Sequence, residues 1–391
     1  MTVTRQELIE AEHSYLMGTF RRLPIALVDG DGVVVRDDAG RTYIDMVAGV
    51  ATNVLGHRHP AIVKALTEQA GRIIHTSNHY YTEPQVGLAR KLVQLSFPSR
   101  VSFANGGAEA NETAIKLARK WGKVNRGGAY EIIVTEGAFH GRTLAAVTAG
   151  GKDAYSAPYA PLPAGFVRVP YGDLEAIRAA TTANTVGVML EPIMGEVGVI
   201  PPPDGYIEGA REWCDARDLL LILDEIQTGI GRTGRWFAHQ HHGITPDIMT
   251  LAKALAGGVP IGACIAAPRA DVFEVGDHGN TFGGNPLATT VGMAVLSTIE
   301  SEGLVGHAAE MGVVLHEVLS GLRGVERVRG RGLMQAVVFT EPVARGFQSR
   351  CLDEGVIVNA IDDHTVRTVP PLVISPAEIE EAGERMRRAQ A

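Results

Sequence analysis

The chain has 391 residues, of which 45% are hydrophobic and 20% are charged, a composition that is ordinary for a globular protein of about two domains. Its 44 acidic and 36 basic residues leave a net charge of −8, which argues against nucleic acid or an anionic membrane as the main partner. Three scattered cysteines, a polar N-terminus and the lack of an apolar run of about 18 residues predict a cytoplasmic protein without disulfides or membrane spans.

The first part of the chain predicts a small meander followed by a helix. Residues 26–47, ALVDGDGVVVRDDAGRTYIDMV, alternate apolar and polar residues around two glycine-containing turns, as an antiparallel meander does. From residue 60 the period changes, because Ile62, Leu66 and Ile73 recur at helical spacing after Pro60, which suits a first helical position. We therefore expect a helix that starts at Pro60 and extends to Ile73.

Short apolar strands then alternate with helical stretches. This alternation predicts an α/β fold whose main sheet is mostly parallel and covered by helices on both faces. In such sheets ligands bind outside the carboxyl ends of the strands, so the residues that follow each strand are the candidate site. The expected strands are RVSFAN, EIIVTE, GFVRVP, VGVMLEP, LLLILDE, DIMTLAK and IGACIAA.

The last part of the chain changes to long helices and a shorter α+β tail. Ser375, Pro376 and Glu378 form a capping box at the start of the final helix. We expect an N-terminal segment, residues 1–59, that packs with the small domain. Residues 60–284 are expected to form the large domain that holds the site, and residues 285–391 the small C-terminal domain.

Small and functional residues follow the first two strands of this sheet. Gly106, Gly107 and Ala108 open a helix, and small residues let backbone amides approach an anion at a helix N-terminus. The alternative is a plain strand-to-helix turn. After the second strand come Phe139, which can stack on a planar ligand, and Arg142, which can bind a carboxylate through two N–H groups. For these two residues the alternative is ordinary surface and core packing.

Acidic residues and one lysine follow the later strands. Glu191 and Glu196 come after the fourth strand, Asp224 and Gln227 after the fifth, and Lys253 after the sixth. The mostly apolar surroundings of Lys253 lower the pKa of its amine and leave a fraction of it neutral, the form that Schiff-base chemistry needs. One cofactor uses all of these parts, since pyridoxal phosphate needs a phosphate site, an aromatic residue on its ring, an acid at its ring nitrogen and a lysine at its aldehyde.

Two other motifs suggest functions that their surroundings do not support. Gly229, Gly231 and Gly234 have the GxGxxG spacing of a dinucleotide loop, but no periodic helix follows and the next acidic residue, Asp247, comes too early. We expect these glycines to shape a turn beside the site. The HQHHG run at 239–243 lacks the further ligands that zinc needs, so it is expected to be a packed loop, and no metal is predicted.

With these residues in place, the chain resembles the class III, fold-type I aminotransferases that depend on pyridoxal phosphate, and within them the acetylornithine/ornithine group. The resemblance runs almost end to end and implies the fold of that class, a large domain around a mainly parallel sheet and a smaller α+β domain. The motifs that carry it are YIDMVAGVATNVLGHRHP, HTSNHYYTEPQ, NGGAEANETAIKLARK, FHGRTLA, MLEPIMGE, DEIQTGIGRTG, PDIMTLAKALAGGVPIGA, GDHGNTFGGNPLA and VRTVPPLVIS.

The resemblance implies a role for each candidate residue at the cofactor. Lys253 is the Schiff-base lysine and moves the proton between the substrate carbon and the cofactor. The other implied contacts are Asp224 at the pyridinium nitrogen, Gln227 near the phenolic oxygen, Phe139 on the ring, the amides of Gly107 and Ala108 at the phosphate, and Thr281 at the phosphate of the partner subunit in a homodimer with shared active sites.

Three further residues are assigned to substrates by the same resemblance. Arg367 resembles the arginine that binds the α-carboxylate, and Glu196 resembles the acid that pairs with this arginine or moves aside. Arg142 holds a second carboxylate or orients the substrate, and which arginine takes which carboxylate stays open.

The chain departs from the family pattern at three positions. Met194 stands where glutamine is usual, Val197 where glycine is usual, and Gly106 where serine is common. Because Met194 and Val197 flank Glu196, they leave the shape of the side-chain pocket and the exact amino donor open.

The expected reaction is a ping-pong transamination. The terminal amino group of N-acetylornithine passes to 2-oxoglutarate and gives a semialdehyde and glutamate, in arginine and ornithine metabolism. The alternative donors are ornithine, succinylornithine, 4-aminobutyrate and other ω-amines. A racemase or aminomutase would share Lys253 and Asp224, although the Arg367–Glu196 pair favours transamination with glutamate. A non-enzymatic nucleotide-binding or scaffold protein would leave Lys253 and Asp224 as coincidences.

Overall fold

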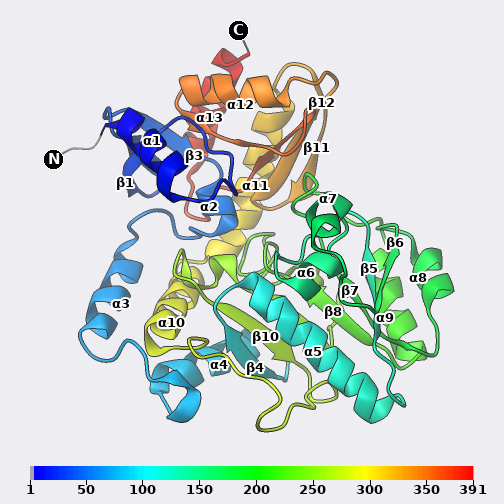
Figure 1. Ribbon diagram of the computed structural model, residues 1–391. Helices are drawn as coiled ribbons and strands as arrows, with labels where there is room; N and C mark the ends of the chain where they lie inside the picture. Colours follow the sequence, from blue (N-terminus) through cyan, green and yellow to red (C-terminus); the bar gives the residue numbers. More distant parts are fainter. Residues whose placement is uncertain (1–3, 391) are drawn as a thin grey trace.

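The computed structural model describes residues 4–390. Figure 1 shows a lower part built around a large sheet and an upper part that contains both ends of the chain. The site and its neighbours follow from how these two parts are built.

The large sheet has the strand order β4-β10-β9-β8-β7-β5-β6. Only β10 runs antiparallel to its two neighbours, while the other pairs along the order are parallel. The predicted α/β fold with a mainly parallel sheet is therefore confirmed. The strands are β4 (Arg100–Ala104), β5 (Glu131–Thr135), β6 (Phe166–Val169), β7 (Thr185–Leu190), β8 (Leu220–Asp224), β9 (Ile248–Leu251) and β10 (Gly262–Ala266).

The side chains of β5 explain why both faces of this sheet are apolar. Ile132 and Val134 pack on one face in a cluster with Trp121 of helix α5 (Gly107–Asn125). Ile133 lies on the opposite face with Ile207 of helix α9 (Tyr206–Ala216). Successive side chains of a strand point to opposite faces, so a sheet between two helical layers needs apolar residues at nearly every position.

The remaining helices of the lower part surround this sheet. Helix α10 packs against α3 and α4, at the lower left in Figure 1. The helices are α3 (Pro60–Ala70), α4 (Glu83–Leu95), α6 (Leu144–Ala149), α7 (Asp153–Ser156), α8 (Leu174–Ala180) and α10 (Pro286–Ser301), with the 3₁₀ helices η1 (Ser77–His79), η2 (Ala157–Tyr159), η3 (Ala238–His241) and η4 (Lys253–Ala256).

Two smaller sheets form the upper part. The N-terminal meander is present as predicted, as β1 (Leu27–Asp31), β2 (Val34–Asp37) and β3 (Thr42–Asp45), and β13 (Val356–Ile357) adds to it in parallel with β3. The second sheet has the order β11-β12-β15-β14, with β11 (Val325–Arg331), β12 (Met334–Phe339), β14 (Asn359–Ala360) and β15 (Thr365–Thr368). The helices here are α1 (Arg5–Tyr15), α2 (Ala48–Ala51), α11 (Leu304–Ser320), α12 (Ala344–Asp353) and α13 (Pro376–Arg388).

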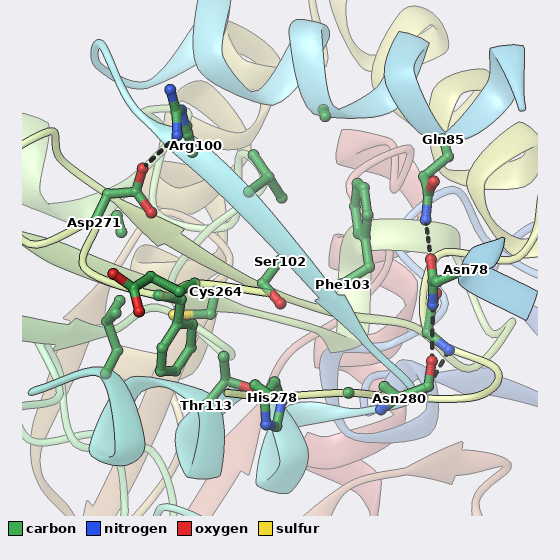
Figure 2. Close-up of a pocket in the computed structure, with 18 of the residues that line it drawn as sticks. Asn78, Gln85, Arg100, Ser102, Phe103, Thr113, Cys264, Asp271, His278 and Asn280 are labelled. Atoms are coloured by element: carbon green, nitrogen blue, oxygen red, sulfur yellow. Dashed lines mark hydrogen bonds and ion pairs between the residues drawn. The ribbon is translucent and has the colours of Figure 1, made fainter. Parts of the chain in front are cut away.

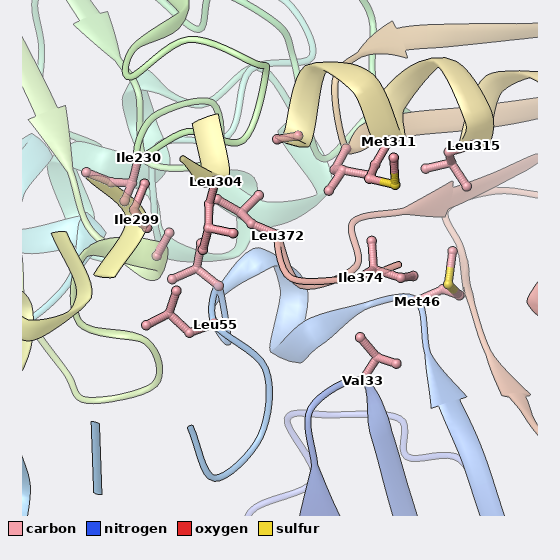
Figure 3. Packing of buried hydrophobic residues seen from close by; sticks show 14 of the residues in the cluster. Val33, Met46, Leu55, Ile230, Ile299, Leu304, Met311, Leu315, Leu372 and Ile374 are labelled. Carbon is pink, nitrogen blue, oxygen red and sulfur yellow. The ribbon is translucent and has the colours of Figure 1, made fainter. Parts of the chain in front are cut away.

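One apolar cluster joins the three predicted segments. Val33 and Met46 of the first segment, Ile230 of the second and Leu304 and Leu372 of the third are all buried in it (Figure 3). Such a shared cluster resists separation of the two parts, because separating them exposes apolar surface to water. The boundaries after residues 59 and 284 stay a prediction.

Two local predictions can be compared directly with the structure. The capping box of Ser375 and Glu378 is present at the start of α13. The helix that begins at Pro60 ends at Ala70 and does not reach Ile73, because Gly71 follows and glycine is a poor helix former; Ile73 is half exposed beyond it. None of the helices within residues 4–390 is long and apolar enough to cross a membrane.

Candidate active site

The predicted strand ends meet at one cavity of about 450 Å³. Its wall takes residues from the loops that follow β4, β5, β7, β8 and β9, which is the edge that the parallel strands predict. Among the predicted site residues, the cavity is lined by Gly107, Ala108, Phe139, Arg142, Asp224, Gln227 and Lys253.

Lys253 is the first residue of η4, and Ala252 alone separates it from the end of β9. Its backbone has a φ of +33°, an uncommon conformation for a residue other than glycine. Its side chain borders the cavity, yet burial in protein lowers the pKa of the amine to about 8, an effect that the nearby Glu196 carboxylate partly opposes. The structure therefore holds an amine that is partly neutral near physiological pH.

We expect this pKa to control how fast the cofactor-free protein captures pyridoxal phosphate. The neutral amine is the form that attacks an aldehyde, and with a pKa of about 8 it is about half of the total at pH 8 and about 1% at pH 6. The capture rate should rise about tenfold per pH unit below pH 8 and level off above it. Stopped-flow absorbance measures this rate, and a rate that keeps rising to pH 10 would contradict the lowered pKa.

Asp224 ends β8 and is held by three donors. Its Oδ2 accepts from Asn111 Nδ2 at 2.7 Å and lies 2.8 Å from His140 Nδ1, and its Oδ1 accepts from the Ile226 N–H at 3.0 Å. Burial alone would lower the pKa of His140, but the hydrogen bond to Asp224 and the charges of Asp224 and Glu191 together outweigh burial and raise it. The result is a carboxylate that is 4% exposed and fixed in position at the cavity wall.

The N-terminus of α5 forms the opposite kind of site, one that suits an anion. This helix has 19 residues, and its N-cap, Gly106, makes no side-chain cap bond. Close packing keeps side chains out, since a Cβ at Gly107 would lie 2.8 Å from Ile226 and one at Gly141 would lie 2.6 Å from the Ala108 Cβ. Exposed amides at a helix N-terminus bind phosphate, so this end of the cavity suits a phosphate group.

Phe139 lies between this anion site and the acidic loops. Its N–H donates to Glu191 Oε1 at 2.9 Å, and Glu191 Oε2 accepts from the Gly195 N–H at 3.1 Å. Burial raises the pKa of Glu191 to about 7, a rise that nearby His140 opposes. The Glu191 carboxyl group thus connects the backbone of the Phe139 loop to the loop of Glu196.

Glu196 and Arg367 adjoin the cavity without lining it. Arg367 Nη1 donates to Glu196 Oε1 at 2.6 Å and to Gln227 Oε1 at 3.2 Å, and Arg367 Nη2 donates to Asn359 Oδ1 at 2.7 Å. Gln227 Nε2 also donates to Glu196 Oε1 at 2.9 Å. Burial would raise the pKa of Glu196, but the charges of Arg367 and Lys253 and the hydrogen bonds from Arg367 and Gln227 together outweigh burial and lower it. The arginine and the acid are therefore a formed ion pair next to Gln227.

Thr281 stands apart from the residues above. It is exposed on the loop before α10 and does not line the cavity of its own chain. Its neighbour Asn280 fixes that loop, since Asn280 Nδ2 donates to Glu109 Oε2 at 2.7 Å and Asn280 Oδ1 accepts from Asn105 Nδ2 at 3.0 Å. The implied contact of Thr281 with a partner subunit stays a prediction.

Of the three departures from the family pattern, Gly106 lines the cavity, whereas Met194 and Val197 do not. Met194 is buried and packs, together with Val197, beside Gly137. A Cβ added at Gly137 would lie 3.6 Å from Met194 Cε and 3.4 Å from Val197 Cγ1. A Cβ at Gly106 would have nothing within 4 Å, so the missing serine leaves open space and no distortion.

The two motifs set aside in the sequence also have clear places. Gly231 and Gly234 have φ values of +84° and +85° and form a turn after β8, which only glycine adopts readily. His239 and His241 bond to the backbone oxygens of Ile244 and Thr233. Among residues 4–390 no cluster of His, Cys, Asp and Glu is arranged to hold a metal ion.

Sequence reasoning missed several residues that hold the predicted ones in place. Asn111 lies within the motif NGGAEANETAIKLARK and Asn359 in a short strand, but nothing in the sequence pointed to the partner of either amide. Tyr155 is the third missed residue, since the centre of its ring lies 3.8 Å from the guanidinium carbon of Arg142. No local pattern marks such residues, because their partners come from distant parts of the chain.

The donor set fits pyridoxal phosphate. A partly neutral lysine suits an aldehyde, a fixed carboxylate suits a protonated ring nitrogen, and the open helix N-terminus suits a phosphate. The cavity of about 450 Å³ is within the usual size of a cofactor site.

Known proteins agree with this assignment. The chain matches the family model for class-III aminotransferases over residues 18–389. An acetylornithine aminotransferase of Mycolicibacterium smegmatis is 47% identical over 93% of each chain. The structure of an ornithine aminotransferase of Toxoplasma gondii, with pyridoxal phosphate partially occupying its active site, matches with a TM-score of 0.95 and 32% identity over 99% of this chain and 94% of that one. An acetylornithine aminotransferase of Elizabethkingia anophelis matches with a TM-score of 0.88 and 33% identity over 99% of each chain.

Proposed function

This chain belongs to the class-III aminotransferases, and we propose that it transfers the terminal amino group of N-acetylornithine to 2-oxoglutarate, giving a semialdehyde and glutamate. Enzymes of this class depend on pyridoxal phosphate. The observation that carries the proposal is that Lys253, Asp224 and the N-terminus of α5 share one cavity. We place the reaction in arginine and ornithine metabolism in the cytoplasm.

The residues of the cavity divide the work as follows. Gly107 and Ala108 would hold the phosphate of pyridoxal phosphate, Phe139 and Gln227 would contact its ring and phenolic oxygen, and Asp224 would keep its ring nitrogen protonated. When bound, pyridoxal phosphate supplies an aldehyde for the amino group and a ring that accepts the electron pair released at the substrate carbon. Lys253 takes the proton from that carbon and returns it, which its lowered pKa favours.

The two arginines give the site two ways to hold a carboxylate. Arg367 is paired with Glu196, so this arginine is withheld while the pair is closed. The donor then uses Arg142, which makes no ion pair among the described residues. When Glu196 moves aside, Arg367 becomes available as well, and the site can bind both carboxylates of 2-oxoglutarate.

A half-reaction experiment tests the proposal. N-acetylornithine, ornithine, 4-aminobutyrate and glutamate are added separately to the purified holoenzyme, and its yellow absorption band is followed. We expect N-acetylornithine and glutamate to bleach the band and 2-oxoglutarate to restore it with release of glutamate. Bleaching by glutamate without bleaching by N-acetylornithine would replace the donor. Turnover without glutamate formation would indicate a racemase or aminomutase, and the lack of a yellow band would contradict the function.

We also propose a homodimer whose interface includes the loop of Thr281. Ile73, Ile74, Tyr80, Tyr81 and Phe282 are each more than half exposed, and backbone and ring contacts place the 73–75 stretch beside the 282–287 stretch. Exposed apolar patches of this kind mark interaction surfaces.

A polar network holds this surface in shape. Figure 2 shows Gln85, Asn78 and Asn280 in a row beside a second cavity, of about 520 Å³, along β4. Asn78 Nδ2 donates to the backbone oxygens of Asn280 and Gly283, at 2.8 and 3.1 Å. Thr281 is exposed on this loop, and we propose that it contacts the phosphate of the partner subunit.

We expect Tyr81→Asp to shift the protein from dimer to monomer. A carboxylate buried without a partner costs about 3 kcal/mol or more, which weakens the dimer by at least ~100-fold. Light scattering after gel filtration measures the mass, and the variant should also lose pyridoxal phosphate faster on dialysis. Val124→Asp, at an exposed apolar position of α5, is the matched control. A Tyr81→Asp dimer as tight as the unmodified one would rule out this surface.

A further inference from the structure

The two arginines of the site are held in opposite ways. Arg367 is 1% exposed and donates hydrogen bonds to Glu196, Gln227 and Asn359. Arg142 is exposed at the cavity wall, and the part of the chain that the structure describes offers it no acidic partner and no hydrogen bond. An unpaired arginine on a loop samples many rotamers, and fixing it on a ligand costs entropy.

Tyr155 is what holds Arg142. The guanidinium carbon of Arg142 lies 3.8 Å from the centre of the Tyr155 ring, well inside the range of a cation–π contact. The same guanidinium is 5.7 Å from the Phe139 ring. The Tyr155 and Phe139 rings meet edge to face, with centres 6.4 Å apart and planes at 89°. The arginine and the two rings therefore form one packed group at the cavity.

The backbone places Tyr155 there through a close approach of two segments. The Gly137 N–H donates to the Gly151 oxygen at 3.2 Å, and the Gly151 N–H donates to the Ala138 oxygen at 2.8 Å. A Cβ at Gly151 would lie 2.1 Å from the Gly137 nitrogen, so only glycine allows this contact. The segment that leads into α7 is thus fixed against the loop of Phe139 and Arg142.

The segment that leads into α7 also contacts the loop of Glu196, the acid that pairs with Arg367. Lys152 Nζ lies 5.5 Å from the Tyr155 ring centre and donates to the backbone oxygen of Glu196 at 3.0 Å. Two cations therefore contact the Tyr155 ring: Arg142, which is free to bind a substrate, and Lys152, which is bonded to the Glu196 loop.

We propose that Tyr155 is a positioning residue that orients the Arg142 guanidinium toward the cavity and so sets the affinity of the enzyme for carboxylate-bearing substrates. A stacked ring restrains the guanidinium plane without using any of its five N–H donors, which all remain for the substrate. A carboxylate partner would hold the arginine equally well but would compete with the substrate. The proposal rests on the proposed function, since it takes a substrate carboxylate as the ligand of Arg142.

The test compares Tyr155→Leu and Tyr155→Gln with Tyr155→Phe in the holoenzyme. For the two variants without a ring we expect the KM of N-acetylornithine to rise about 5- to 30-fold, with kcat within about twofold. Tyr155→Phe keeps the ring and should behave as the unmodified enzyme. N-acetylputrescine, the donor without its carboxylate, should show the same KM in all of them.

A binding measurement separates this proposal from the choice of donor. Glutarate, an unreactive dicarboxylate, is titrated into each holoenzyme by calorimetry, and its Kd should rise as KM does. Arg142→Ala should raise the Kd of glutarate, and adding Tyr155→Leu to it should raise the Kd no further.

Several outcomes would overturn the proposal. The first is an unchanged Kd of glutarate in both ringless variants, and the second is additive effects of Tyr155→Leu and Arg142→Ala on that Kd. The third is a rise in the KM of N-acetylputrescine equal to that of N-acetylornithine. The fourth is a rise in the KM of N-acetylornithine in Tyr155→Phe as large as in the ringless variants. The melting temperature and the yellow band of each variant show that it is folded and loaded. If the Kd of glutarate rises in the ringless variants as expected but no form of the enzyme turns over N-acetylornithine, the role of Tyr155 is supported and the proposed donor is rejected.

Discussion

Replacing Lys253 by alanine is expected to lower the rate of transamination at least about 10⁴-fold, because one change removes both a nucleophile and a general acid–base group. Among residues 4–390, Lys253 is the only lysine that lines the cavity. Its surroundings also suit the task, since burial lowers its pKa to about 8 and makes it able to accept a proton near neutral pH. No other described residue that lines the cavity has a side-chain amine that could replace it.

Two measurements check this expectation. The kcat of Lys253→Ala gives the size of the loss, and mass spectrometry after borohydride reduction shows whether the cofactor is bound covalently. The unmodified enzyme should keep the reduced cofactor on its chain, and Lys253→Ala should not. Lys64→Ala, on the exposed face of α3, is the control and should match the unmodified enzyme. Covalent retention by Lys253→Ala would assign the cofactor to another lysine.

Replacing Asp224 by asparagine is expected to be the second largest effect, a loss of about 10²- to 10³-fold in kcat. A neutral amide does not stabilise a positive ring nitrogen, so the electron pair released from the substrate carbon is held less well. An amide has only one acceptor oxygen, so Asp224→Asn cannot keep both the bonds that Asn111 and His140 make to Oδ2 and the bond that the Ile226 N–H makes to Oδ1.

The loss should appear in kcat more than in cofactor binding. Lys253 and the N-terminus of α5 are unchanged in Asp224→Asn, so the protein should still take up pyridoxal phosphate. Absorbance titration gives the affinity for the cofactor, and single-turnover kinetics with glutamate gives the chemical step. If the variant reacts at the normal rate, the assignment of Asp224 to the ring nitrogen is wrong.

The sequence by itself determined the secondary structure around the site. The runs LLLILDE and DIMTLAK predicted β8 and β9, and both Asp224, which ends β8, and Lys253, two residues after β9, line the cavity as the parallel sheet requires. These predictions succeeded because apolar periodicity, glycine and capping residues act over a few positions of the chain. The prediction failed at Ile73, because it followed the apolar spacing past Gly71, where α3 has already ended.

Only the tertiary structure decided which side chains support the predicted ones. Arg367 and Glu196 are 171 positions apart, and Asn111 and Asp224 are 113 positions apart. Strand order and register bring such pairs together, and neither can be read from a local pattern. The contact of Tyr155 with Arg142 likewise depends on the approach of Gly151 to Gly137. The sequence therefore names the groups that do the chemistry, while the packing of distant segments determines how firmly each one is held.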